Sequence, residues 1–246
     1  MTSYTDSRSH AAGSQFRRLS HGFSLLEMAI VLAIVGLLLA GLIPTLSAQI
    51  EQQRRSDTRK HLDEIQQALM GYAIINGFLP CPTTTTDPAN ANYGSADASC
   101  SANPTTEGYL PWKTLGVSEI DAWGNPRSNA SAPWTGYWRY RIDRNFATAL
   151  TLSTGFSADK LSIVNNSGNL ITSGTSGCTA TPTSECPIAI IYSTGPNLTA
   201  DGQNASIEST SGIYQSDVPS PAFDDILIWI SRPQLFNRLV TAGKLP

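Results

Sequence analysis

The apolar residues of this chain gather first in one long stretch near its N-terminus. From Phe23 to Ile43 the sequence reads FSLLEMAIVLAIVGLLLAGLI, which is 21 residues with a single charge, Glu27. A helix needs about 20 apolar residues to cross a bilayer, and it satisfies its own backbone hydrogen bonds in lipid. The stretch therefore predicts a transmembrane helix over residues 23–43.

The pattern then changes to that of an amphipathic helix, which we expect over residues 44–77. Polar residues prevail after Pro44, and Asn76 with Gly77 supplies a helix stop. Apolar residues recur every three or four positions, which is the spacing of one buried helix face. They are Leu62, Ile65, Leu69 and Tyr72. We expect one long helix that kinks at Pro44, because proline cannot donate the backbone hydrogen bond of a regular turn.

Residues 78–246 have the composition of a globular head with long loops, rich in Thr, Ser, Asn, Gly and Pro. Runs of β-branched and aromatic residues predict strands, of which the last is expected to be central. These runs are 137–142, 161–164, 188–192 and 226–230. A final helix is predicted between Ser231 and Gly243. The fold class is therefore α+β, with a long N-terminal helix packed on an antiparallel sheet.

Composition and charge exclude several classes of protein. Only 14% of the residues are charged and the net charge is −3, so nothing favours nucleic-acid binding. The mean hydropathy of −0.12 excludes a polytopic membrane protein. The sequence contains no Gly-x-Ser-x-Gly motif and no phosphate-binding glycine loop, so we predict that the protein is not an enzyme.

Glu27 is the residue that calls for an explanation. A carboxylate near the centre of a bilayer costs roughly 2–3 kcal/mol or more, so such a residue is a functional candidate by default. It follows a polar leader, residues 1–22, that carries Arg8, Arg17 and Arg18.

The order of residues at this junction resembles the leader of type IV prepilins and of type II secretion pseudopilins. The matching features are Arg17-Arg18, Gly22, Phe23, Glu27 and the apolar run that follows. The resemblance implies that prepilin peptidase cleaves after Gly22 and that Phe23 becomes N-methylated. It also implies that the carboxylate of Glu27 meets the new terminal amine of a neighbouring subunit during assembly.

The resemblance implies a structural subunit of a pilus or pseudopilus, with a pilin-like fold. Such a protein has a single pass through the bacterial inner membrane and a periplasmic head. Its partners would be other pilin-type subunits, the inner-membrane assembly platform and inner-membrane lipid. The large head points to a minor or atypical member, and the sequence leaves open whether the machine serves secretion, pili or DNA uptake.

Three other interpretations remain at this stage. One is a secretory signal peptide, although an acidic residue just before a short apolar core is atypical of that class. Another is a single-pass membrane-anchored periplasmic binding module, and the third is an anchored hydrolase without a recognisable motif. The N-terminal residue of the mature protein separates them from a processed subunit.

The four cysteines are Cys81, Cys100, Cys178 and Cys186. Four cysteines allow three pairings, and the sequence does not choose among them. Sequential pairing would staple two loop-rich stretches. An even number of cysteines in loops favours disulfides in an oxidising compartment such as the periplasm.

Motifs within the head extend the resemblance to the pseudopilins. Residues 121–126 read Asp-Ala-Trp-Gly-Asn-Pro, and residues 193–197 and 224–229 resemble the two ends of the C-terminal loop. In that family the loop binds Ca²⁺, which implies a calcium site at Asp201, Asp224 and Asp225, because hard cations need several oxygen ligands. Here Asn197 stands where an acidic residue is usual, and 26 residues separate the two ends. The alternative is a set of solvated or helix-capping aspartates at the start of a strand.

Overall fold

The computed structural model of the protein describes residues 24–100, 107–157, 161–172, 186–206 and 212–245, without the side chains of residues 39–46. The chain divides into two compact units, residues 1–49 and residues 50–246. The second unit is the head, and it contains the C-terminal part of the long helix.

Helix α1 runs from Leu25 to Asn76 and has 52 residues, which is about 78 Å of helix at about 1.5 Å per residue. It begins where the Ser24 hydroxyl accepts a hydrogen bond of 3.1 Å from the backbone N–H of Glu27. It ends where Gly77 adopts the left-handed conformation, with φ of 79°, and donates its N–H to the Ala73 carbonyl at 2.8 Å. The predicted helix stop is thus confirmed.

Helix α1 continues through Pro44 without interruption. The kink predicted at that residue stays a prediction, since its side chain lies outside the described part of α1. Within the described residues, no helix combines the length and the apolar character that a membrane crossing requires.

The head is built on a four-stranded antiparallel sheet with strand order β1-β2-β4-β6. The strands are β1 (Gly108–Tyr109), β2 (Arg139–Ile142), β4 (Pro187–Ser193) and β6 (Ile226–Ser231). All seven residues of β4 are buried, because β4 lies between β2 and β6 with both faces covered. The predicted antiparallel sheet is therefore confirmed.

The prediction that residues 226–230 form a central strand is wrong, because β6 lies at the edge of this sheet. The strand still reads as a continuous apolar run because its alternating side chains enter two different apolar clusters, Ile226 and Ile230 in one and Leu227 in the other. The Gln66 side chain of α1 donates a hydrogen bond of 3.1 Å to the backbone carbonyl of Trp229. A run of apolar residues reports burial, and burial does not reveal how many neighbours a strand has.

A second, two-stranded sheet pairs β3 (Ser162–Val164) with β5 (Ile213–Gln215) in parallel. The sequence predicted β3 but not β5, and not the parallel pairing. The helical segments of the head are short: α2 (Trp112–Leu115), η1 (Arg144–Ala147), η3 (Gly202–Ser206) and α3 (Arg232–Thr241). Helix α3 has Pro233 in its first turn and is followed by Gly243 with φ of 67°, as predicted.

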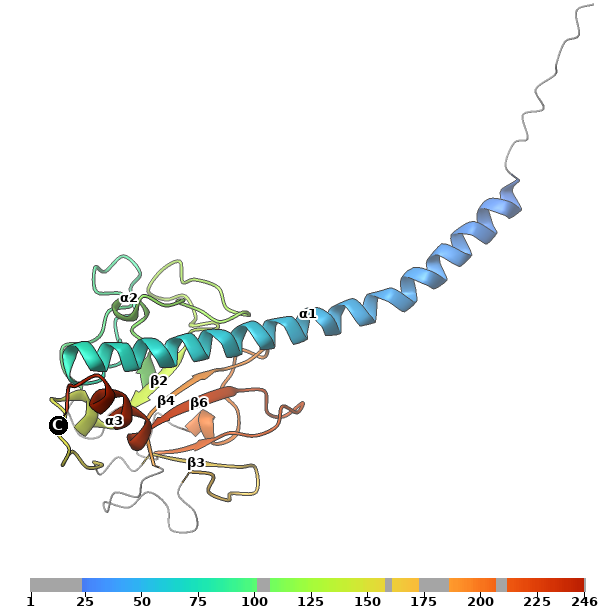
Figure 1. Cartoon of the computed structure of the whole chain (residues 1–246). Coiled ribbons are helices and arrows are strands. Elements are labelled where there is room, and N and C mark those ends of the chain that lie inside the picture. Colours follow the sequence, from blue (N-terminus) through green and yellow to red (C-terminus); the bar gives the residue numbers. More distant parts are fainter. Residues whose placement is uncertain (1–23, 101–106, 158–160, 173–185, 207–211, 246) are drawn as a thin grey trace, which may run out of the picture. The chain divides into compact units, whose positions relative to one another are not determined.

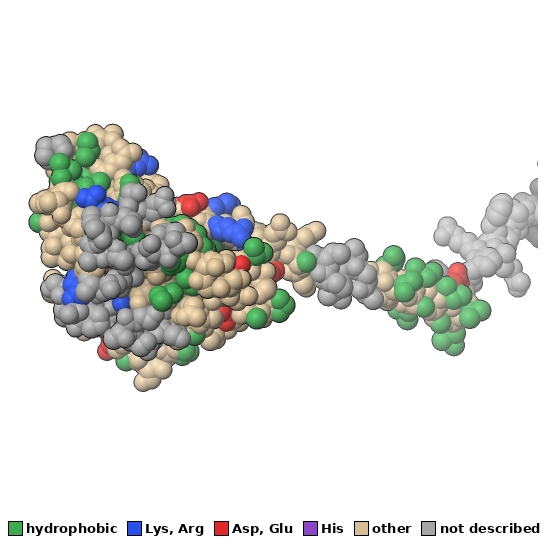
Figure 2. Space-filling view, turned by 90° about the horizontal axis from the view of Figure 1, so that it is seen from below, with side chains coloured by type: hydrophobic (Ala, Val, Ile, Leu, Met, Phe, Trp, Pro, Cys, Tyr) green, Lys and Arg blue, Asp and Glu red, His purple; other side chains and the backbone are tan. Residues whose placement is uncertain are grey.

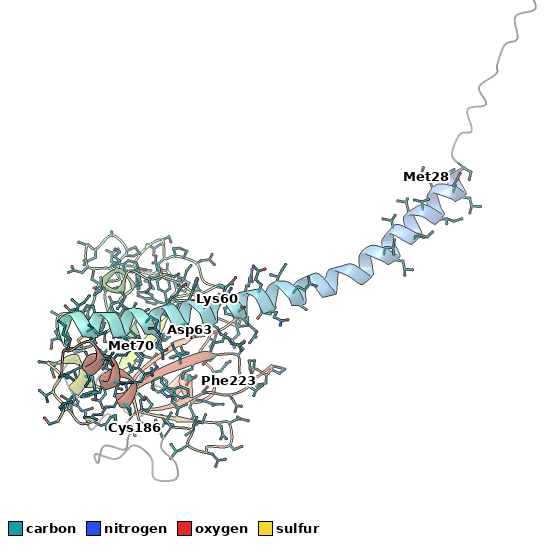
Figure 3. All side chains as sticks on the ribbon, in the orientation of Figure 1. Met28, Lys60, Asp63, Met70, Cys186 and Phe223 are labelled. Atoms are coloured by element: carbon teal, nitrogen blue, oxygen red, sulfur yellow. A yellow bond between two sulfur atoms is a disulfide. The ribbon has the colours of Figure 1, made fainter. Side chains whose placement is uncertain are left out.

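The main core lies between α1 and the sheet (Figure 1). Leu62, Ile65 and Leu69 of α1 are fully buried, as the spacing predicted, and Tyr72 is half-buried. The three leucine and isoleucine residues share one apolar cluster with Ile188 and other residues of β4. Figure 3 labels Met70 on this packed stretch of α1, where only 3% of the residue is exposed.

One disulfide joins Cys81 to Cys100. This confirms the first link of the sequential pairing. Cys186 is also disulfide-bonded, whereas Cys178 lies outside the described residues.

The packing of α1 on the sheet can be tested by comparing two alanine substitutions in the head, residues 50–246. This unit contains every residue of the apolar clusters. Replacing fully buried Leu69 by alanine should lower the free energy of unfolding by about 2–5 kcal/mol, because it leaves a cavity. Ile75→Ala on the same helix, where 77% of the residue is exposed, should change it by less than about 0.5 kcal/mol. Urea denaturation followed by circular dichroism measures both values, and equal losses would contradict this packing.

Candidate functional site

Two parts of the molecule carry the residues singled out by the sequence, and the first is the N-terminal segment. Gly22 and Phe23 lie outside the described residues. Glu27 is exposed in the first turn of α1, and its backbone N–H is capped by Ser24. The spacing Ser-x-x-Glu is that of a helix-capping box, so these residues also stabilise the start of α1.

Apolar side chains surround Glu27 and cover the described N-terminal part of α1. Figure 2 shows hydrophobic side chains across the visible face of this stretch. Ten large apolar residues between positions 25 and 38 are each at least 44% exposed. They are Leu25, Leu26, Met28, Ile30, Val31, Leu32, Ile34, Val35, Leu37 and Leu38. An apolar surface of this extent marks a site of contact with lipid or protein.

The second part is an acidic cluster in the head, formed by Asp201, Asp224 and Asp225. Each offers a carboxylate oxygen within 4.8 Å of the other two. The backbone N–H of Asp224 donates to Asp201 Oδ2 at 2.9 Å, and the backbone N–H of Asp201 donates to Asp225 Oδ2 at 3.0 Å. The structure thus brings together three residues that the sequence separates by up to 24 positions.

Two oxygens of the acidic cluster are buried without a hydrogen-bond partner among the described residues. They are Asp224 Oδ1 and Asp225 Oδ1. Burial raises the pKa of Asp225 to about 7. Burial, followed by the nearby carboxylate of Asp201, also raises the pKa of Asp224. Unsatisfied buried oxygens in a cluster of three carboxylates fit a bound cation, which would supply both the missing partner and the missing charge.

The loop after β4 supports this cluster. Gly195 has φ of 64°, and a Cβ atom there would lie 2.3 Å from Asp224 Oδ1, so only glycine leaves room for that carboxylate. Asn197 Nδ2 donates to both carboxylate oxygens of Asp201 at 3.1 Å. Asn197, where the sequence departs from the pseudopilin pattern, thus acts as a donor that orients Asp201.

Sequence reasoning missed one residue of this site, Asn204 in η3. Its side-chain Nδ2 donates to Asp225 Oδ2 at 2.8 Å and to the Gln215 carbonyl at 3.1 Å. Only 2% of Asn204 is exposed. Nothing in the sequence marks it, because its role depends on η3 folding back against β5 and the start of β6.

The Asp-Ala-Trp-Gly-Asn-Pro segment lies against the same loop. Asp121 Oδ1 accepts hydrogen bonds of 2.9 Å from the backbone N–H groups of Trp123 and Gly124. Asp121 Oδ2 accepts one of 2.5 Å from the Ser193 hydroxyl at the end of β4. Gly124 packs against Gly136, where a Cβ atom would lie 2.2 Å from the Gly124 Cα. The glycine of the motif is thus required by a close approach of two backbone segments.

Comparison with known proteins gives one match. Residues 17–43 match the family model described as the prokaryotic N-terminal methylation motif. No curated protein and no solved structure matches the chain. The match spans the predicted cleavage junction, Glu27 and the apolar stretch, and it implies processing by prepilin peptidase and assembly with other pilin subunits. The N-terminal segment of this chain is therefore a prepilin-type methylation motif, the signature of type IV pilins and pseudopilins.

Proposed function

We propose that this chain is a non-enzymatic structural subunit of a type IV pilus or a type II secretion pseudopilus. The observation that carries the proposal is the methylation motif over residues 17–43, which is continuous with helix α1. The part of α1 in the first unit is apolar on its surface, and the part in the second unit belongs to the core of the head. A subunit that is held through the N-terminal part of its helix and displays its head needs an apolar surface on the first part and a packed core around the second.

The apolar segment would first anchor the precursor in the inner membrane, with the head in the periplasm. The Cys81–Cys100 disulfide supports this location, because disulfides persist in oxidising compartments. After cleavage at Gly22 the same surface would leave lipid for the core of a filament. The inner-membrane assembly platform would be the partner for that step.

Glu27 has a specific part in this proposal. Cleavage would create an α-ammonium group on Phe23, four residues before Glu27. In a low-dielectric filament core, an ammonium and a carboxylate attract strongly, whereas either group alone is costly. The pair would therefore favour stacked subunits over separate ones.

The experiment that tests the proposal is the mass and N-terminal sequence of the native protein. A chain that begins with methylated Phe23 is the expected result, since only the prepilin pathway produces it. An intact Met1 in a host with an active prepilin peptidase would refute processing and leave a membrane anchor.

Glu27→Gln should leave cleavage and methylation intact but reduce incorporation into filaments by about tenfold or more, because the terminal ammonium would lose its counter-charge. Sheared filament fractions, compared with total processed protein, measure the effect. Glu64→Gln is the matched control, because Glu64 lies exposed on the same helix. Normal incorporation of the Glu27 variant would contradict the assigned role.

We also propose that the acidic cluster binds Ca²⁺. Asp201, Asp224 and Asp225 would hold the ion, with the two unpartnered oxygens as ligands. The bound ion supplies positive charge to a buried group of carboxylates. Its role here is structural, because it would tie the loop after β4 to η3 and to the start of β6.

The raised pKa of Asp225, about 7, gives this proposal a pH signature. A carboxyl group whose pKa is raised by folding stabilises the protein when protonated, and this contribution is lost as the pH rises from about 4 through about 7. In EDTA, the melting temperature of the wild type should therefore fall between pH 5 and pH 8, which is roughly the titration range of the raised pKa. In Asp225→Asn this fall should be smaller.

At pH 8, Ca²⁺ at about 100 times its Kd should stabilise the wild type by about 2.7 kcal/mol, a shift of roughly 5–10 °C for a head of this size. Differential scanning fluorimetry measures both effects. Asp57→Asn, at a partly exposed residue of α1 outside the acidic cluster, should keep the calcium shift. The absence of any shift at millimolar Ca²⁺ would reject the site.

A second candidate function is a membrane-anchored binding module, and one cavity favours it. The cavity has a volume of about 310 Å³ and is lined by Trp134, Tyr137, Arg139, Leu198 and Asn204 among others. Leu198 is the one residue other than glycine with positive φ among the described residues, at 60°. The intact Met1 that refutes the first proposal would favour this one.

A further inference from the structure

We propose that Ser193, Asp121 and Trp123 form a hydrogen-bonded relay between the acidic cluster and helix α1. Through this relay, a cation in the head would fix the stretch of α1 that enters the head. The inference rests on the cation site proposed above. It assigns these three residues as positioning residues, which need not touch the ion themselves.

The first link joins the acidic cluster to the end of β4. Asp224 Oδ1 lies directly on the backbone of Gly195, where a Cβ atom would come within 2.3 Å of it. The backbone N–H of Gly195 donates a hydrogen bond of 3.0 Å to the Ser193 hydroxyl oxygen. The Asp224 carboxylate is therefore in close contact with a turn whose backbone is held by Ser193.

The second link joins Ser193 to the Asp-Ala-Trp-Gly-Asn-Pro segment. The Ser193 hydroxyl donates to Asp121 Oδ2 at 2.5 Å. Asp121 Oδ1 accepts the backbone N–H of Trp123 at 2.9 Å. Ser193 is fully buried and Asp121 is 5% exposed, so water does not compete for these hydrogen bonds.

The third link reaches α1. Trp123 Nε1 donates a hydrogen bond of 3.1 Å to Glu51 Oε2. The other oxygen of Glu51 accepts from Arg55 Nε at 2.9 Å, one turn further along the helix. Glu51 is the second residue of the head unit, which begins at Ile50. Trp123 thus holds α1 at the point where the helix enters the head.

Charge supports the same connection. The guanidinium of Arg55 lowers the pKa of Asp224, and the carboxylate of Glu51 raises it, although burial is the largest effect on that group. Residues of α1 and the acidic cluster therefore lie within electrostatic reach of each other. A divalent cation beside Asp224 would reverse the sign of the local charge, and this favours Glu51 in its docked position.

If such a relay exists, cation binding and the docking of α1 must affect each other reciprocally. If the cation strengthens the docking of α1, then loss of the Trp123–Glu51 hydrogen bond must weaken cation binding by the same factor. Trp123→Phe removes the indole N–H donor and keeps an aromatic ring. We expect it to weaken Ca²⁺ binding roughly two- to thirtyfold, which is the range expected for residues that couple two sites.

The experiment is hydrogen–deuterium exchange of the full processed chain in detergent, in CaCl₂ and in EDTA. In the wild type, Ca²⁺ should slow exchange in peptides covering residues 195–201, residues 224–225 and also residues 50–58 of α1. In Trp123→Phe the first two regions should remain protected by Ca²⁺, while the protection of residues 50–58 is lost. Ser193→Ala, which breaks the relay one step earlier, should give the same pattern.

Trp229→Phe is the matched control. Trp229 is also partly exposed and lies on β6, but its side chain is not part of the relay. This variant should keep both the calcium affinity and the protection of α1. Isothermal titration with CaCl₂ measures the affinities of all variants.

The outcomes separate this inference from the site on which it rests. If Ca²⁺ changes neither melting temperature nor exchange in the wild type, both the cation site and the relay are refuted. If Ca²⁺ stabilises the acidic cluster but leaves residues 50–58 unchanged, the site stands and the relay is wrong. Equal calcium affinities of the wild type and Trp123→Phe would refute the relay as well.

Discussion

The burial of one face of α1 against the central strands is the interaction on which the rest of the head depends. Leu62, Ile65 and Leu69 are fully buried and share a cluster with residues of β4. This contact covers one face of the sheet, and Gln66 of α1 also donates a hydrogen bond to the Trp229 carbonyl of β6.

A second constraint is that the head buries several carboxylates, each of which needs partners. Asp121 obtains them from Ser193 and from two backbone N–H groups. Glu107, whose side chain is fully buried, obtains them from Arg139 and from the hydroxyls of Tyr192 and Tyr214. Asp224 and Asp225 each keep one buried oxygen without a partner among the described residues. This difference is what distinguishes the proposed cation site from the other buried carboxylates of the head.

The methylation motif and the proposed cation site differ in how the sequence encodes them. The N-terminal motif is a linear pattern: residues 17–43 match their family model through the order of residues along the chain. The acidic cluster exists only after folding, because η3 and the loop after β4 must meet the start of β6. Asn204 and Gly195 complete it through contacts that span 11 to 29 residues of sequence.

The sequence by itself determined the long helix, its stop at Asn76, the buried face of α1, the four runs that became strands and the methylation motif. These features depend on local periodicity, on glycine and on residue order, which act over short distances along the chain. Only the tertiary structure decided that β6 is an edge strand, that β3 and β5 pair in parallel, and that Cys81 bonds Cys100. It also decided that Asn197 and Asn204 orient the aspartates. Those outcomes depend on which distant segments pack together, and a pattern of buried residues does not specify the partner that buries them.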